Sequence, residues 1–212
     1  MPALSYKNAY IDFSENEASW RSRLSCRTEI RRAAHASIRV SHLSDRPHAV
    51  LAACWAMLRS VLASESIPYD PAFDTLLADR SLDLFVAYSG ETPCSFVLFD
   101  PHPAHTYFPG HATAYLSLSA TDARFRPACP NYAALDAALS FFRSRAYRYA
   151  NLGLLGFDGM HDEDLARVAF FKRKWGVIEV PERKECSWLR FAYYRYFRRF
   201  GAVRRFAYFM KS

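Results

Sequence analysis

One lysine near the end of the sequence stands where a helix would bury apolar side chains. Residues 147–176, YRYANLGLLGFDGMHDEDLARVAFFKRKWG, read as a short β-rich run, a loop, and a helix that ends near Gly176. At 100° per residue, Lys172 falls within the apolar stripe of that helix, between Ala169 and Trp175. A buried ammonium is costly unless it is paired or faces a wet cleft, so one interpretation is a chemical role. The other interpretation is structural: the aliphatic part of the Lys172 side chain lies along the core, and its ammonium reaches solvent past the end of the helix.

Other residue patterns that could do chemistry are weaker. The acidic run at residues 162–164 suits the start of a helix, where carboxylates complement the helix dipole. The three glycines of the loop lack the spacing of a dinucleotide site. His102, His105 and His111 lie in a Pro-rich stretch without a fourth ligand, so we expect no metal site. No Gly-x-Ser-x-Gly elbow is present, and no cysteine has an evident histidine partner in the sequence.

The composition is that of one globular domain. The 212 residues are 51% hydrophobic, 23% charged and 16% aromatic, which is enough to build a substantial core. No apolar signal-peptide core follows Met1, and the apolar run at residues 49–63 is too short to span a bilayer. Five scattered cysteines without CxxC spacing indicate free thiols. These features predict a cytoplasmic protein.

The net charge of +7 is confined to the last part of the sequence. Residues 186–212 hold seven basic residues and no acidic one, so the rest of the chain is neutral. Arginines interleaved with aromatics favour a nucleic-acid backbone with stacked bases. The same composition on an amphipathic helix suits an anionic membrane surface. A terminal helix that packs its aromatics on the domain is a third interpretation.

The periodicity predicts the elements that would position Lys172. The first part of the chain is predicted to form strands at 6–13 and 38–41 and helices at 16–35 and 47–64, followed by a short helix at 73–77. A hairpin at 82–99, further strands at 105–108 and 113–119, a helix at 130–146 and a strand at 149–155 precede the lysine helix. Strands at 177–180 and 186–191 and a helix from 193 complete the series. The order indicates a mixed α/β (α+β) fold, with a mostly antiparallel central sheet that crosses over late and helices flanking it.

This order is that of the GNAT acyltransferase fold, and four segments resemble the Fem-type (FemAB/FemX-like) peptidyltransferases within that superfamily. They are LSCRTEIRRAAHASIRV (24–40), DLFVAYSGETPCSFVLFD (83–100), YLSLSATDARFRPACPNYAALDAAL (115–139), and the strand ANLGL (150–154) with the helix end FFKRKWG (170–176). The resemblance covers roughly residues 20–180. Fem-type enzymes usually carry two tandem GNAT-like domains, whereas this chain has room for one.

The resemblance implies a site where two strands diverge, near residues 115–119 and 151–155. Lys172 matches the lysine of the Fem-type F-K-x-x-F/W-G motif, which acts on the ester of the acyl donor. The residues expected to bind substrate are Phe171, Tyr115, Asn131, Tyr132 and Trp175. The residues expected to bind phosphate or tRNA are Arg124, Arg126, Arg173, Lys174, Arg198, Arg199, Arg204 and Arg205.

One departure concerns the acyl donor. The Arg/Gln-x-x-Gly-x-Gly signature that cradles the pyrophosphate of coenzyme A is absent before Asn131, where the sequence reads ARFRPACP. Without those glycines the backbone amides cannot wrap a pyrophosphate in the usual way, although Arg124 and Arg126 could still hold phosphate. The missing signature and the basic tail favour aminoacyl-tRNA over acyl-CoA.

The sequence therefore predicts an amide-forming N-acyltransferase with three segments: a strand and basic helix (1–40), the GNAT-like domain (41–191), and a basic aromatic helix (192–212). It would need no cofactor and would transfer an aminoacyl group from aminoacyl-tRNA to an amine on a small molecule or peptide. The alternatives are an acyl-CoA or acyl-carrier-protein donor, and a non-catalytic module that binds RNA or an anionic membrane.

Overall fold

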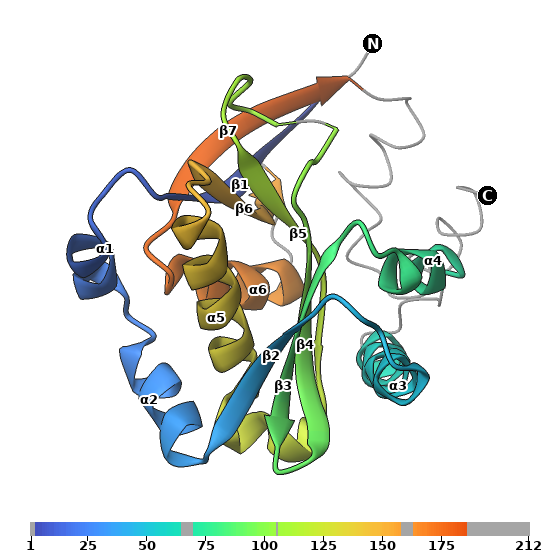
Figure 1. The fold of residues 1–212 in the computed structure, drawn as a ribbon. Helices are drawn as coiled ribbons and strands as arrows, with labels where there is room; N and C mark the ends of the chain where they lie inside the picture. The colour runs from blue at the N-terminus through green and yellow to red at the C-terminus, as the bar shows by residue number, and fades with distance from the viewer. Residues whose placement is uncertain (1–2, 65–69, 105, 158–162, 186–212) are drawn as a thin grey trace.

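A twisted sheet with the strand order β2-β3-β4-β5-β6-β1-β7 runs through the molecule in the computed structural model of the chain (Figure 1). The structure describes residues 3–64, 70–104, 106–157 and 163–185. The strands are β1 (Ala3–Asp12), β2 (Ile38–Leu43), β3 (Asp83–Ser89), β4 (Thr92–Asp100), β5 (Thr113–Thr121), β6 (Tyr149–Phe157) and β7 (Ile178–Glu185). The mixed α/β class predicted from the sequence is confirmed.

Helices cover both faces of this sheet (Figure 1). On one face lie α1 (Glu17–Arg23), α2 (Arg27–His35), α5 (Pro130–Ser144) and α6 (Glu163–Arg173), and on the other lie α3 (His48–Ser64) and α4 (Ala72–Ala78). A 3-10 helix, η1 (Ala123–Ala128), precedes α5. Strand β3 is apolar almost throughout because it is buried on both sides: Phe85 joins the core under α5, whereas Leu84 and Val86 join the core under α3.

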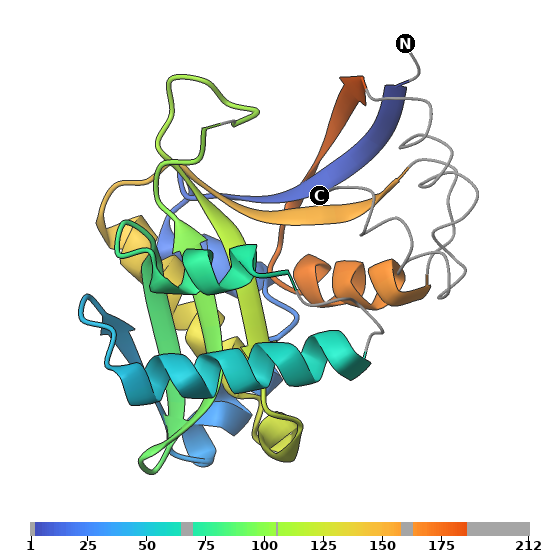
Figure 2. The ribbon, with the colours of Figure 1, turned by 90° about the vertical axis from the view of Figure 1, so that its right-hand side faces the viewer.

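The sheet opens between β5 and β6. All other neighbouring strands pair antiparallel, but these two pair in parallel, and only Thr113–Tyr115 with Tyr149–Asn151. Beyond those residues the two strands diverge, and α6 lies beside the half of the sheet that β6, β1 and β7 form (Figure 2). The late crossover expected from the sequence is confirmed, and the divergence leaves an opening in the sheet.

Three of the predicted elements differ in the structure. The helix expected over residues 16–35 is two helices with a break at Leu24–Cys26. The strand expected at 105–108 is wrong, because residues 106–108 belong to an irregular loop. Strand β7 continues to Glu185, past the expected end at Val180. The strand predicted at 186–191 and the helix predicted from residue 193 lie outside the described residues.

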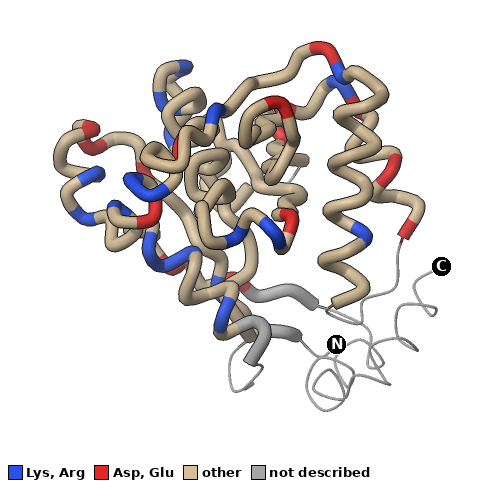
Figure 3. The backbone as a smooth tube through the Cα atoms, turned by 90° about the horizontal axis from the view of Figure 1, so that it is seen from below, with Lys and Arg blue, Asp and Glu red and all other residues tan. Residues whose placement is uncertain are grey.

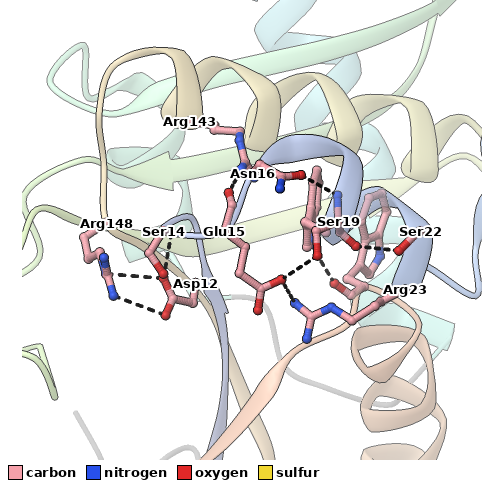
Figure 4. Close-up of polar contacts among 11 residues, drawn as sticks. Asp12, Ser14, Glu15, Asn16, Ser19, Ser22, Arg23, Arg143 and Arg148 are labelled. Carbon is pink, nitrogen blue, oxygen red and sulfur yellow. Dashed lines mark hydrogen bonds and ion pairs between the residues drawn. The ribbon is translucent and has the colours of Figure 1, made fainter.

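Polar contacts fix the start of α1 (Figure 4). The Asn16 side chain accepts a hydrogen bond of 2.8 Å from the Ser19 amide and so caps the helix. Arg143 of α5 donates to the Glu15 carbonyl, and Arg148 pairs with Asp12 at 3.3 Å. Helix α1 is therefore tied to α5 and to the turn before β6.

The break after α1 holds the end of α6. The Ser25 amide donates to the Lys174 carbonyl at 3.0 Å, and the Trp20 indole Nε1 donates to the Trp175 carbonyl at 3.2 Å. Carbonyls at a helix C-terminus lack partners within the helix, so these two bonds satisfy groups that would otherwise be orphaned. A continuous helix over residues 16–35 would not present both donors to α6.

We predict that Trp20→Phe lowers the free energy of unfolding by roughly 1–3 kcal/mol, because a buried carbonyl loses its donor. Trp55→Phe is the control, since the Trp55 indole nitrogen is buried and has no hydrogen-bond partner among the described residues. Urea unfolding of the two variants measures the difference. Equal losses would mean that the bond to Trp175 does not stabilise the end of α6.

Candidate active site

The ammonium of Lys172 lies inside the protein, in the last turn of α6. The residue is 9% exposed, and its Nζ donates a hydrogen bond of 2.8 Å to the Leu154 carbonyl on β6. Among the described residues no carboxylate pairs with it. Burial lowers the pKa of Lys172 from 10.5 to about 8, because desolvation penalises the charged form. At pH 7 the group is still mainly protonated.

The backbone of β6 makes room for this ammonium at Gly153. Its φ of +81° is the left-handed conformation that favours glycine. A Cβ atom at Gly153 would meet Lys172 Nζ at 3.4 Å and the Tyr115 hydroxyl at 3.7 Å. The Asn151 side chain accepts a 2.7 Å hydrogen bond from the Gly153 amide and holds this bend. Lys172 and Tyr115 thus approach the same point of β6, beside the opening in the sheet.

Tyr115 is the last residue of β5 that pairs with β6, and it is 37% exposed. Burial of its ring, and to a lesser extent the charge of Glu182, raise the pKa of Tyr115. The phenol therefore stays neutral at physiological pH and can donate or accept a hydrogen bond.

A cleft of about 470 Å³ opens beside Lys172, within the range of small-molecule sites. Its walls come mainly from α6, β5 and the start of α5, with single residues from η1, α3 and β4, and they are mostly apolar. Four of the expected site residues line it besides Lys172: Phe171, Asn131, Tyr132 and Arg126. The structure thus brings together residues that lie up to 46 positions apart in the sequence.

Trp175 supports this cleft from behind and does not line it. The residue is fully buried, and its ring lies nearly parallel to that of Tyr132, with 6.0 Å between centroids. Phe171 packs edge-on against Tyr132 at 5.0 Å. Of the five residues expected to bind substrate, Trp175 can act only through the two aromatic side chains that it positions.

Most of the described cations that were expected to bind phosphate already have carboxylate partners. Arg173 pairs with Glu179 at 2.7 Å, Arg124 pairs with Asp122 at 2.6 Å, and Lys174 pairs with Glu29. Among the described residues Arg126 has no ion-pair partner, and it lines the cleft. The other four, Arg198, Arg199, Arg204 and Arg205, lie outside the described residues.

In the turn before α5, backbone amides donate hydrogen bonds to other groups of the same turn. In η1 the Phe125 amide donates to the Asp122 carbonyl and the Cys129 amide to the Arg126 carbonyl, each at 3.0 Å. The Arg124 amide donates to the Asp122 side chain at 3.0 Å, and Pro127 has no amide hydrogen. A run of free N–H groups, which a pyrophosphate cradle requires, is not present there.

Sequence reasoning placed the reaction near residues 151–155 but gave no role to Gly153 or Asn151, which shape the site from β6. A signal was present, because a glycine inside a strand pattern often marks a bulge or a close approach. The described residues contain no group of three His, Cys, Asp or Glu that could hold a metal ion. None of the described helices has the length and apolar character needed to cross a bilayer.

We predict that the stability of the protein rises between about pH 8 and pH 10.5 because of Lys172. In that interval the unfolded chain keeps the proton that the folded chain has released, so the unfolded state binds more protons and unfolding becomes harder as the pH rises. The shift corresponds to about 3 kcal/mol. The measurement is urea unfolding across this interval, for the wild type and for Lys172→Met.

Lys172→Met should lose this rise, whereas Lys174→Met should keep it, because the hydrogen bond that Lys174 donates to Glu29 raises the pKa of Lys174. If the free energy of unfolding still rises with pH in Lys172→Met, the rise comes from another titratable group.

Solved structures share this architecture. FemX aligns with a TM-score of 0.64 and 11% identity, over 82% of this chain and 59% of its own. L-PGS from Bacillus licheniformis aligns with a TM-score of 0.64 and 13% identity, over 90% of this chain and 64% of its own. A conserved protein of unknown function from Bacteroides thetaiotaomicron aligns with a TM-score of 0.53 and 13% identity, over 85% and 60%. This chain thus spans about three fifths of the length of those proteins.

No family model matches the sequence, and no curated protein is significantly similar to it. At these identities the structural likeness concerns the fold. The likeness to FemX and L-PGS extends over more than four fifths of this chain, so the chain has a Fem-type, GNAT-like fold.

Proposed function

We propose that this chain is an N-acyltransferase that passes an aminoacyl group from aminoacyl-tRNA to an amine. The observation that carries the proposal is the position of Lys172: a buried ammonium, without a carboxylate partner among the described residues, that lines a cleft at the opening of the sheet. Desolvation of an ammonium costs free energy, and a charged group that is kept in a cleft despite this cost is typical of a functional site. The shared fold supports acyl transfer as the reaction class.

The reaction needs stabilisation of a developing negative charge. The nitrogen of the acceptor attacks the ester carbonyl, a C–N bond forms, and the carbonyl oxygen becomes an oxyanion. The C–O bond to the ribose then breaks, the ribose oxygen gains a proton, and the nitrogen loses one. The Lys172 ammonium, fixed in a site of low dielectric, would stabilise the oxyanion or the leaving oxygen with no reorganisation during the step.

The protonation state of Lys172 suits this role. Its pKa of about 8 keeps it cationic at pH 7, yet makes it a stronger acid than an exposed lysine. It can therefore give a proton to the leaving ribose oxygen and recover one from the attacking nitrogen. The neighbouring Tyr115 hydroxyl can donate a second hydrogen bond to the same centre.

A tRNA donor is supported by arginines near the cleft that have no ion-pair partner in the described part of the chain. Arg126 lines the cleft, and α2 packs against η1. Arg27, Arg31 and Arg32 are exposed on α2, and the guanidinium of Arg32 lies 3.9 Å from the Cys129 sulfur, directly before α5. Figure 3, which views the molecule from the end where α2 and η1 lie, shows several basic segments there. A polyanion such as tRNA fits such a surface, while η1 lacks the free amides that a coenzyme A pyrophosphate would use.

The test is a single-turnover assay with charged tRNA and a panel of primary amines. We expect the wild type to form the amide, and Lys172→Ala to slow the chemical step by a factor of about 10²–10³, which is typical of the loss of an oxyanion donor. Lys7→Ala, on the exposed surface of β1, is the control for general loss of charge. Transfer at the wild-type rate by Lys172→Ala would remove Lys172 from the mechanism.

The donor is tested by filter retention of charged tRNA at several salt concentrations. Arg126→Ala should weaken retention and reduce its salt dependence, because a phosphate contact is lost. Arg124→Ala, on the same 3-10 helix but paired with Asp122, is the matched control and should change retention less. If the protein does not retain tRNA but transfers an acyl group from coenzyme A or a carrier protein, the donor proposed here is wrong. If the protein retains tRNA but transfers no acyl group, the result would favour a non-catalytic module that binds RNA.

A further inference from the structure

A carboxylate that has no cation partner among the described residues lies where β1 and β7 pair at the edge of the sheet. Glu182 of β7 accepts hydrogen bonds from Asn8 Nδ2 at 2.7 Å, from the Tyr6 hydroxyl at 3.0 Å and from the Tyr10 hydroxyl at 3.4 Å, all of them on β1. All three donors are neutral. No Lys or Arg among the described residues forms an ion pair with Glu182, although Glu179 on the same strand pairs with both Arg173 and Lys7.

Three neutral donors hold this carboxylate in place without neutralising it. An ionised carboxylate offers about four lone-pair positions, so it can accept a further, charged donor. Tyr10 is almost fully buried, and burial together with the charge of Glu182 raises its pKa to about 12. Tyr10 therefore stays a neutral phenol that donates its hydrogen bond to Glu182.

The Glu182 site lies on the face of the sheet opposite to α6. Along β1, Ala9 and Ile11 belong to the core that includes Ala169 and Trp175, whereas Tyr10 belongs to a separate cluster with Tyr149. Side chains alternate along a strand, so Tyr6, Asn8 and Tyr10 share the other face with Glu182. Most of the cleft beside Lys172 is lined from the α5 and α6 side.

Tyr115 connects the two faces. Its hydroxyl approaches the same point of Gly153 as Lys172 Nζ, and the charge of Glu182 contributes to its raised pKa. A ligand held at Glu182 is therefore near the opening between β5 and β6, where the proposed acyl transfer takes place. Aromatic rings border the position, because Tyr6 packs edge-on against Phe157 with 6.0 Å between centroids. Ring faces attract cations as carboxylates do.

We propose that Glu182, with Tyr6, Asn8 and Tyr10, binds the cationic amine of the acyl acceptor on the face of the sheet opposite to α6. The acceptor class is a primary amine that is protonated in solution. The ammonium donates to Glu182 and gives up a proton to solvent before its nitrogen attacks the ester. The donor and the acceptor then reach the opening from opposite sides of the sheet. This inference rests on the proposed function.

Direct binding of an amine tests the site without requiring transfer. The full chain is titrated with cadaverine, a primary diamine, and with 1,5-pentanediol, an uncharged analogue of the same length, while NMR chemical shifts are followed at pH 7. We expect cadaverine to shift signals around Glu182 and the diol to leave them unchanged. Glu182→Gln should weaken cadaverine binding by at least about tenfold, because a charge-assisted hydrogen bond is lost.

Glu179→Gln is the matched control, since it removes the same charge from the same strand. It should bind cadaverine as the wild type does. The inference would be overturned if both variants lost cadaverine binding equally, if both bound cadaverine as the wild type does, or if the wild type did not bind it. Thermal unfolding of both variants separates misfolding from loss of binding.

The transfer assay separates this inference from the proposed function. If transfer occurs, Glu182→Gln should raise the KM for the amine about tenfold and leave the KM for the donor unchanged. Wild-type kinetics in Glu182→Gln would refute the acceptor site and leave the acyltransferase intact. If cadaverine binding depends on Glu182 but no donor is ever consumed, the amine site stands and the proposed function fails.

Discussion

The free energy needed to bury one ammonium group is the constraint on which the rest of the site depends. Lys172 is enclosed and donates a hydrogen bond to the Leu154 carbonyl, and among the described residues no carboxylate offsets its desolvation. Desolvation on this scale destabilises the folded state at neutral pH. The core on both faces of the sheet must supply the compensating stability. The same desolvation strengthens any interaction of this charge with an oxyanion that enters the cleft.

Several separate elements keep the charge in place. The end of α6 is held by Trp20 and Ser25, which reach its last carbonyls because the preceding helix breaks at Leu24. On the other side, the bend of β6 at Gly153 brings a backbone carbonyl within reach of the ammonium and leaves space for it. The divergence of β5 and β6 then exposes this point to ligands. The site is thus a property of the sheet opening and not of the lysine alone.

The order of the elements could be predicted from the sequence because the periodicity of each segment is clear. Helices and strands around Lys172 were expected within a few residues of their observed bounds, and the inward position of the lysine followed from helix geometry. The break at Leu24 could not be predicted, since it depends on hydrogen bonds to Lys174 and Trp175, about 150 residues later. The ion pairs of Arg173 and Lys174 could not be predicted either, because their carboxylate partners lie on other elements, β7 and α2.

The most direct test of this account is an NMR titration of the Lys172 side-chain nitrogen in the full chain, assigned by comparison with Lys172→Arg. The account predicts a midpoint near pH 8, together with a change in that midpoint when a non-hydrolysable aminoacyl ester analogue fills the cleft. A midpoint near the ordinary lysine value of 10.5, unchanged by the analogue, would contradict it.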